Sequence, residues 1–286
     1  MKPLIFPAKY SVVSVLVSNM WIDTHAHLAE PEYTAEIDQV IQNALDHHIQ
    51  RVLLIGCGIT KAKEVIALAH RYPNFFRCII GFHPEDILDI SEADWLEMAE
   101  LIQEPFVLAV GEIGLDYYWD KDPMHHETQK EVFIRQIQLA NQFNKPIAIH
   151  SRDSIQVTYD ILNQYPVLRK GIMHCYSGSV EMAERFIQLG YYISLAGPLT
   201  FKNAHVPKEV ASQIDINHLL IETDSPYLSP EPFRGKRNES AYVEYTGIKM
   251  AELKQIDSKI LQDKLLENYL RLFPEETQEL SYLPER

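Results

Sequence analysis

The chain has 286 residues, of which 46% are hydrophobic, so it can bury a large core, and α/β barrels commonly use about 250 residues as one domain. Lys and Arg number 26 against 40 Asp and Glu, and the formal net charge of −14 excludes an extended surface that coats nucleic acid. Cys57, Cys78 and Cys175 are odd in number and widely spaced, which argues against a disulfide framework and predicts a cytoplasmic protein.

Residues 1–19 differ in character from the rest of the chain. Lys2 and Lys9 precede the apolar stretch 12–17, and together they faintly resemble a secretion signal. The stretch is short, however, and no small-residue cleavage site follows it. The stretch is also far below the ~20 apolar residues of a membrane span, so we expect no membrane association. Because Met20 directly precedes the first expected strand, we favour a start-site artefact or a loosely ordered extension over secretion.

From Trp21 onward, short apolar runs alternate with segments of helical periodicity. The first strand is expected at 21–23, and the next apolar residues share one helix face: Ile37, Val40, Ile41, Ala44 and Leu45. The run 51–56 predicts a strand buried on both faces, and a helix over 61–71 follows it. Six further strands are expected near 77–81, 106–111, 146–150, 171–175, 191–195 and 218–223.

Helical patterns separate these later strands and also follow the last of them. Phe133, Ile137 and Ala140 mark one such helix. A terminal amphipathic segment is expected to pack over the outer ring of helices, and its apolar face carries Leu261, Leu265, Tyr269 and Leu272.

Eight parallel strands with intervening helices predict a closed (β/α)₈ TIM barrel over residues 20–275 as one domain, with 276–286 as a C-terminal tail. The alternative is an open, doubly wound sheet. Its usual glycine-rich phosphate motif is missing, because Gly56-Cys57-Gly58 lacks the third glycine at the required spacing.

Histidines end several of the expected strands. Side chains two apart on a strand point to the same side, so His25 and His27 can face one ion. A single histidine on an apolar strand is more often a satisfied core residue, but four of the 12 fall at the barrel end where active sites are built: His25, His27, His150 and His174. This coincidence predicts a hydrolytic metal centre.

Glu112 directly follows the apolar run 108–111, where an unpaired carboxylate would be very costly. Its two oxygens could bridge two cations, one held by each pair of histidines. The alternative is a buried ion pair with Arg152 or Lys145.

Three further residues are candidates around this centre. Asp224 ends the eighth strand and could bind the first metal and accept a proton from its water, or could cap the turn before Ser225-Pro226. Glu222 lies two residues earlier and could support the ligands from behind. His83 could reach a substrate phosphate or leaving group, or could stabilise its own turn.

Basic and aromatic residues follow several of the strands. The basic residues could bind phosphates or could simply be solvated, and they are Arg152, Lys202, Arg234, Lys236 and Arg237. Three aromatic residues follow Glu112 and could stack on exposed bases or pack as a lid: Tyr117, Tyr118 and Trp119.

The chain resembles the TatD family of metal-dependent deoxyribonucleases in several motifs taken together. The motifs are Asp-Thr-His-Ala-His-Leu (23–28), Gly-Glu-Ile-Gly-Leu-Asp-Tyr (111–117), His-Ser-Arg (150–152), His-Cys-Tyr-Ser-Gly (174–178) and Glu-Thr-Asp-Ser-Pro-Tyr-Leu (222–228). Gly-Phe-His-Pro (81–84), Leu-Thr-Phe-Lys-Asn (199–203) and Arg-Gly-Lys-Arg-Asn-Glu (234–239) stand in the same family order. The resemblance covers nearly everything from Met20 to Phe273, and Ser240 departs from it where a proline is usual.

The resemblance implies a cytosolic amidohydrolase-type barrel with one or two divalent metals, Mg²⁺, Mn²⁺ or Zn²⁺, that hydrolyses DNA, in several members from a 3′ end. By position, His25, His27, Glu112 and Asp224 would serve one metal, and Glu112, His150 and His174 the second. The expected substrate is single-stranded or end-accessible DNA, and we expect a monomer. Glu112, Asp224 and His83 are the expected catalytic residues.

Two other functions remain open on the sequence. A barrel with such a metal set also supports hydrolysis of a small amide, lactone or phosphoester. A function from another class is that of a non-catalytic DNA-binding or scaffold protein with a structural metal, although structural sites are usually closed and rich in cysteine.

Overall fold

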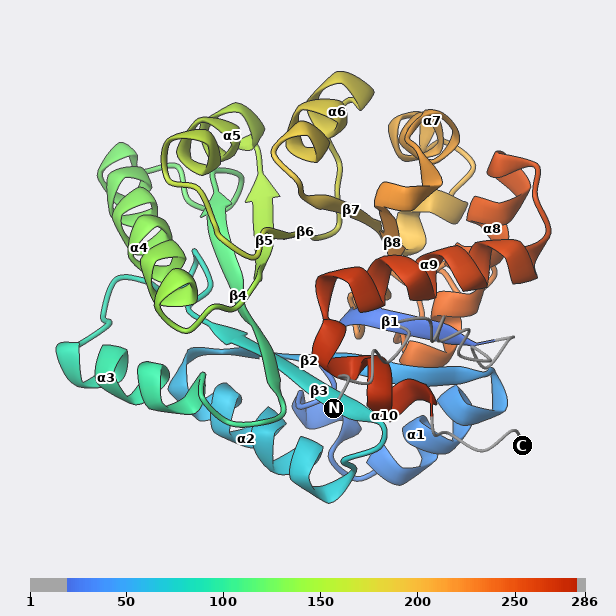
Figure 1. Ribbon diagram of the computed structural model, residues 1–286, viewed down its shortest axis with the longest axis horizontal. Coiled ribbons are helices and arrows are strands. Elements are labelled where there is room, and N and C mark those ends of the chain that lie inside the picture. The colour runs from blue at the N-terminus through green and yellow to red at the C-terminus, as the bar shows by residue number, and fades with distance from the viewer. Residues whose placement is uncertain (1–19, 282–286) are drawn as a thin grey trace, which may run out of the picture.

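Eight strands pair in parallel and in chain order, the order that successive β–helix–β crossovers produce. The computed structural model describes residues 20–281 (Figure 1), so our expectation for residues 1–19 lies outside the described residues. The strands are β1 (Trp21–Ala26), β2 (Ile49–Cys57), β3 (Phe76–Gly81), β4 (Val107–Asp116), β5 (Ile147–Arg152), β6 (Gly171–Met173), β7 (Tyr192–Leu195) and β8 (Leu219–Ile221).

The sheet closes nearly completely where β8 meets β1. An isolated bridge joins Ala26 to Ser225, the Asp224 N–H donates to the His25 carbonyl at 2.9 Å, and the His27 N–H donates to the Ser225 carbonyl at 2.8 Å. The predicted (β/α)₈ TIM barrel is confirmed, and the open-sheet alternative is wrong.

Helices connect the strands and form the outer layer (Figure 1). They are α1 (Ile37–Asp46), α2 (Gly58–Arg71), α3 (Glu92–Leu101), α4 (Pro123–Gln142), α5 (Ile155–Gln164), α6 (Val180–Gln188), α7 (His205–Gln213), α8 (Val243–Lys254), α9 (Ser258–Leu272) and α10 (Thr277–Ser281). Local sequence sets several starts: Ser91 and Asp94 form a capping box at α3, and Asp122 caps α4 just before Pro123. No helix within residues 20–281 has the length and apolarity needed to cross a bilayer.

The strands are apolar on both sides because each separates two cores. Val52 and Leu54 belong to the cluster between the strands and the outer helices, whereas Leu53 and Ile55 belong to the cluster inside the barrel. This double burial explains why the strands read as continuous apolar runs.

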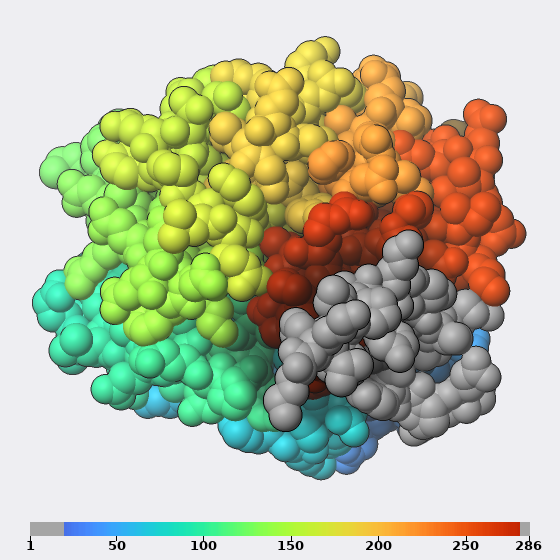
Figure 2. Space-filling model, viewed as in Figure 1, coloured from blue at the N-terminus to red at the C-terminus, as the bar shows by residue number. Residues whose placement is uncertain are grey.

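Helix α9 packs against both cores: Leu261 and Leu265 belong to the cluster between the strands and the outer helices, as expected, and the rest of its apolar face reaches the interior cluster. Leu266, Tyr269 and Leu272 pack with the inward-facing residues of the strands, and Figure 1 shows α9, in red, beside β8 and β1. In Figure 2 this C-terminal segment, in dark red, occupies the middle of the face, bordered by the green and yellow parts of the chain.

A buried ion network fixes the residues that follow α9. Arg51 and Arg77 lie near the starts of β2 and β3 and are only 1% and 2% exposed. Glu276 lies between them, with Oε2 2.7 Å from Arg51 Nε and Oε1 accepting from Arg77 Nε at 2.6 Å. The Tyr269 hydroxyl also donates to Glu276. Glu276 and Leu280 are thus packed against the barrel, and the predicted boundary between the domain and a tail 276–286 stays a prediction.

Candidate metal centre

Strand β4 brings two carboxylates into the barrel mouth instead of one. It continues to Asp116, well beyond its expected end at Gly111, and pairs Gly114 with His150 and Asp116 with Arg152 on β5. Gly114 has a φ of 142°, and a Cβ there would clash with the His150 carbonyl. Glycine at this position therefore lets β4 approach β5 closely enough for Glu112 to reach His150.

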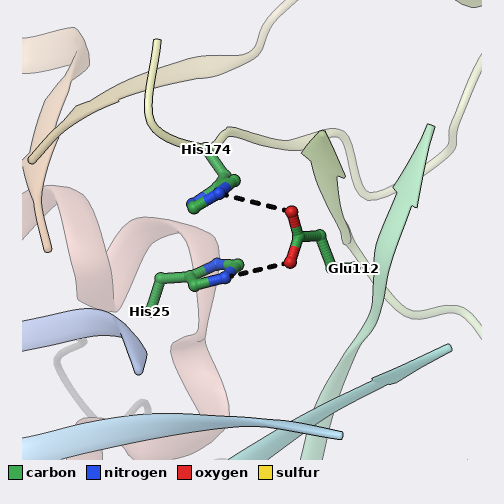
Figure 3. A group of neighbouring side chains, drawn as sticks. All are labelled: His25, Glu112 and His174. Atoms are coloured by element: carbon green, nitrogen blue, oxygen red, sulfur yellow. Dashed lines mark ion pairs between the residues drawn. The ribbon is translucent and has the colours of Figure 1, made fainter. Parts of the chain in front are cut away.

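Glu112 lies at the centre of a cluster of histidines, and each of its oxygens faces a different group. Oε2 lies 3.2 Å from His25 Nε2 and 3.8 Å from His27 Nε2. Oε1 lies 2.7 Å from His150 Nδ1 and 3.3 Å from His174 Nε2. Figure 3 shows the carboxylate of Glu112 facing the rings of His25 and His174.

Asp224 completes the first of these groups. Its Oδ1 lies 3.4 Å from His27 Nε2 and 3.8 Å from His25 Nε2. Asp224 adopts a left-handed backbone with φ 56°, a conformation that non-glycine residues rarely hold and that clusters at functional sites. The side chain is thereby aimed at the histidines rather than at the turn that follows it.

Two more carboxylates hold the histidines from behind. His150 Nε2 hydrogen-bonds Asp116 Oδ2 at 2.9 Å, and His174 Nδ1 lies 2.7 Å from Glu222 Oε1, which also accepts from the Cys175 N–H. Such pairs fix the ring of a metal-ligating histidine and raise its basicity. The sequence predicted the supporting role of Glu222 but not that of Asp116. Asp116 could have been found by continuing β4, because residues two apart on a strand, such as Glu112, Gly114 and Asp116, face the same side.

The electrostatics of the cluster favour positive charge. Burial alone would lower the pKa of His150, but hydrogen bonds to Asp116 and Glu112 raise it to about 9. Burial opposes charge on His174 as well, yet Glu222 and Glu112 raise its pKa to about 10. Burial would raise the pKa of Glu112, whereas His174 and His25 hold it well below its usual range. The carboxylates therefore stabilise cations at this place.

The donor set fits a divalent metal. His25 Nε2 and His27 Nε2 point at each other across 3.3 Å, and with an Asp224 oxygen they converge within 4.8 Å of one another. A second group, His25, Glu112 and His174, and a third, His83, Glu112 and His150, meet the same limit. Mixed imidazole and carboxylate donors accept Zn²⁺, Mn²⁺ or Fe²⁺ readily and Mg²⁺ less comfortably.

His83 stabilises its own turn and also faces the cluster, while its contact with a substrate stays a prediction. Its Nδ1 accepts from the Glu85 N–H at 3.3 Å, which fixes the turn, and its Nε2 lies 3.6 Å from Glu112 Oε1. His83 also lines a cavity of about 690 Å³ at the barrel mouth, a size typical of small-ligand sites. Other residues of the cavity wall include His27, Glu112, His150, His174 and Asp224.

Of the five basic residues considered for phosphate binding, the cavity wall includes only Arg152. Arg237 donates to Glu36 and to the Glu32 carbonyl, and Arg234 stacks 4.3 Å from the centre of the Phe201 ring. Phosphate binding by Lys202, Arg234, Lys236 and Arg237 stays a prediction. Neither Arg152 nor Lys145 pairs with Glu112, since Arg152 stacks on Tyr118 and Lys145 donates to the Val107 carbonyl.

Replacing Glu222 with Gln is expected to weaken binding of a divalent ion about 10- to 100-fold, because His174 loses the carboxylate that orients it. Competition against a chromogenic chelator measures the affinity. Glu184→Gln, an exposed glutamate on α6, is the matched control and should bind as the parent does. Equal affinities for Glu222→Gln and the parent would show that Glu222 does not support the site.

Comparisons with known proteins identify the family of this chain. The family described as TatD related DNase matches residues 22–274. The uncharacterized metal-dependent hydrolase YabD of Bacillus subtilis is 43% identical over 89% of this chain and 99% of its own. The uncharacterized metal-dependent hydrolase YcfH of Escherichia coli K12 is 34% identical over 88% of this chain and 95% of its own.

A solved structure shares the fold. The crystal structure of YjjV, a TatD homologue from Escherichia coli K12, superposes with a TM-score of 0.84 at 28% identity, over 88% of this chain and 97% of that one. The fold is shared with a TatD homologue, and relatives match over nearly their whole length. Histidines and carboxylates also converge at the barrel mouth. The chain belongs to the TatD family and is a metal-dependent hydrolase.

Proposed function

We propose that the protein is a deoxyribonuclease that removes nucleotides from an accessible 3′ end of DNA. The proposal rests on the position of Glu112, whose two carboxylate oxygens face separate histidine groups beside one cavity. Paired metal sites of this kind serve in-line displacement at phosphorus. The family description supports DNA as the substrate. A cavity of about 690 Å³ is suited to a terminal nucleotide rather than to a continuous duplex.

The residues present would hold two divalent ions. His25, His27, Asp224 and Glu112 would hold one, and Glu112, His150 and His174 would hold the other. Bound ions would polarise the scissile phosphate and lower the pKa of the attacking water. Zn²⁺, Mn²⁺ and Mg²⁺ are the candidates, in the order in which imidazole-rich donors accept them.

The protein's own side chains would orient the substrate and move the proton. The Asp224 carboxylate, on the cavity wall beside His27, accepts the proton of the attacking water. His83 Nε2, which faces the same space, hydrogen-bonds the leaving oxygen, and the Arg152 guanidinium binds a phosphate oxygen. The substrate and DNA as a partner are parts of this proposal, as are a monomeric state and a cytoplasmic location.

Hydrolysis of a small amide, lactone or phosphoester is the second candidate, and one observation favours it. Glu85 and Asp86 line the cavity, and Arg152 is the only Lys or Arg of the described residues among the lining side chains, so the wall repels a long polyanion. A non-catalytic scaffold is disfavoured because the candidate ligands open onto a cavity rather than closing around an ion. Parallel assays on oligonucleotides blocked at either end and on a panel of amides, lactones and phosphoesters decide between these functions.

Removal of divalent ions is expected to abolish hydrolysis and to destabilise the fold. A ligand that binds only the native state stabilises it by about 2.7 kcal/mol at 100 times its Kd. Dialysis against a chelator should therefore stop cleavage of a 3′-accessible labelled oligonucleotide and lower the melting temperature. Added Zn²⁺ or Mn²⁺ should restore both. Undiminished cleavage after exhaustive chelation would contradict the proposed function.

A further inference from the structure

The loop after β4 presents exposed aromatic side chains at the cavity. Trp119 is 63% exposed and lines the cavity wall, and Tyr118 beside it is 43% exposed. The other two tryptophans, Trp21 and Trp95, are 3% and 6% exposed and serve the core. The indole of Trp119 is thus not needed for packing, and large aromatic surface left open at a cavity marks a binding position.

Arg152 forms a flat, charged partner for these rings. Its guanidinium carbon lies 4.0 Å from the centre of the Tyr118 ring and 5.3 Å from that of Trp119. Tyr118 and Trp119 meet edge to face, with centroids 4.8 Å apart. A guanidinium stacked on aromatic rings is held in one plane while it keeps its donors free for a phosphate.

Asp116 ties this loop to the metal centre. Its Oδ1 accepts the backbone N–H groups of Tyr118 and Trp119, at 2.8 Å and 2.9 Å, while its Oδ2 hydrogen-bonds His150. The Tyr117 N–H donates to the Arg152 carbonyl at 2.9 Å. The aromatic loop and the ligand His150 therefore share one carboxylate and have a fixed separation.

We propose that Trp119, Tyr118 and Arg152 form a subsite for a nucleobase, that of the nucleotide next to the scissile phosphate. This inference rests on the proposed function and names how that site selects its substrate. Base stacking is tolerant of sequence and contributes binding without a basic surface. It thus allows a chain with a net charge of −14 and an acidic cavity rim to hold a DNA end.

The subsite is tested first by tryptophan fluorescence, without turnover. Deoxyadenosine monophosphate, added to the protein with divalent ion present, is expected to quench the emission saturably, because Trp119 is the one exposed tryptophan. Deoxyribose 5-phosphate, which has the same phosphate but no base, should not quench it. Trp119→Phe should remove the quenching. Equal quenching by the two ligands, or unchanged quenching in Trp119→Phe, would overturn the subsite.

Cleavage gives the second test. We compare kcat/KM for an oligonucleotide with an ordinary 3′ end with kcat/KM for one with an abasic 3′ end. The ratio of the first value to the second should fall about 5- to 100-fold in Trp119→Ala. Trp119→Phe should keep most of the ratio. Met124→Ala, an exposed residue of α4 outside the cavity wall, should leave it unchanged. An unchanged ratio in Trp119→Ala would overturn the subsite. If the parent cleaves neither oligonucleotide, the proposed function fails, and the fluorescence result still decides the subsite.

Discussion

Glu112→Gln is expected to lower kcat/KM for DNA cleavage by at least about 100-fold, which exceeds the usual effect of residues that only support metal ligands. Gln has the same shape but carries no charge and offers only one acceptor oxygen. It therefore cannot face His25 and His150 simultaneously with carboxylate oxygens, as Glu112 does. Steady-state kinetics on a 3′-accessible oligonucleotide and the metal content of the purified variant measure the effect together.

The control for this prediction is another glutamate changed in the same way. Glu131→Gln lies on the exposed side of α4 and should keep the activity and metal content of the parent. The folded state of Glu112→Gln should be retained, because the variant is isosteric and the barrel core is unchanged. A Glu112→Gln protein with parental kcat/KM would remove Glu112 from the mechanism.

Glu276→Gln is expected to lower the free energy of unfolding by about 3–5 kcal/mol, the usual cost of leaving a buried charge without its partner. Glu276 is the shared partner of Arg51 and Arg77, both buried near the strand starts. Loss of its charge leaves the two buried guanidinium groups with only the half-exposed Glu279 as a carboxylate partner. Urea unfolding followed by circular dichroism measures the change, and the slope against urea should stay the same.

A neighbouring glutamate provides the comparison for Glu276. Glu279 contacts the same two arginines but is 54% exposed, so Glu279→Gln should cost at most about 1 kcal/mol. Because the network lies at the strand starts and the metal centre at the strand ends, kcat/KM of Glu276→Gln below its melting temperature should match the parent. A loss in Glu276→Gln no larger than that of Glu279→Gln would show that the buried network does not hold the C-terminal segment.

The barrel and most of the site could be predicted from local patterns. Strands buried on both faces read as continuous apolar runs, as in 51–56, and parallel order then places every strand end at one mouth. His25, His27, His150 and His174 came together for this reason. Agreement between pattern and structure is strongest where one rule, burial of both strand faces, fixes the placement.

Other features depend on contacts that no local pattern contains. Gly111 looked like the end of a strand, yet it lies inside β4, where an added Cβ would come within 2.8 Å of Ala148. Asp116 was missed as a consequence. The partner of Arg77 is Glu276, which lies 199 residues away in the sequence. The burial of the Arg77 side chain therefore could not be predicted from the residues next to it. The basic loop residues likewise gave no sign that Arg237 would pair with Glu36.

We propose that six side chains on or just after five strands hold divalent ions at one mouth of the barrel. Crystals grown with Mn²⁺ and measured by anomalous diffraction provide the decisive test. We expect anomalous density in contact with Glu112, flanked by His25, His27 and Asp224 on one side and by His150 and His174 on the other. Crystals that diffract well and show bound Mn²⁺ elsewhere, with none against Glu112, would contradict it.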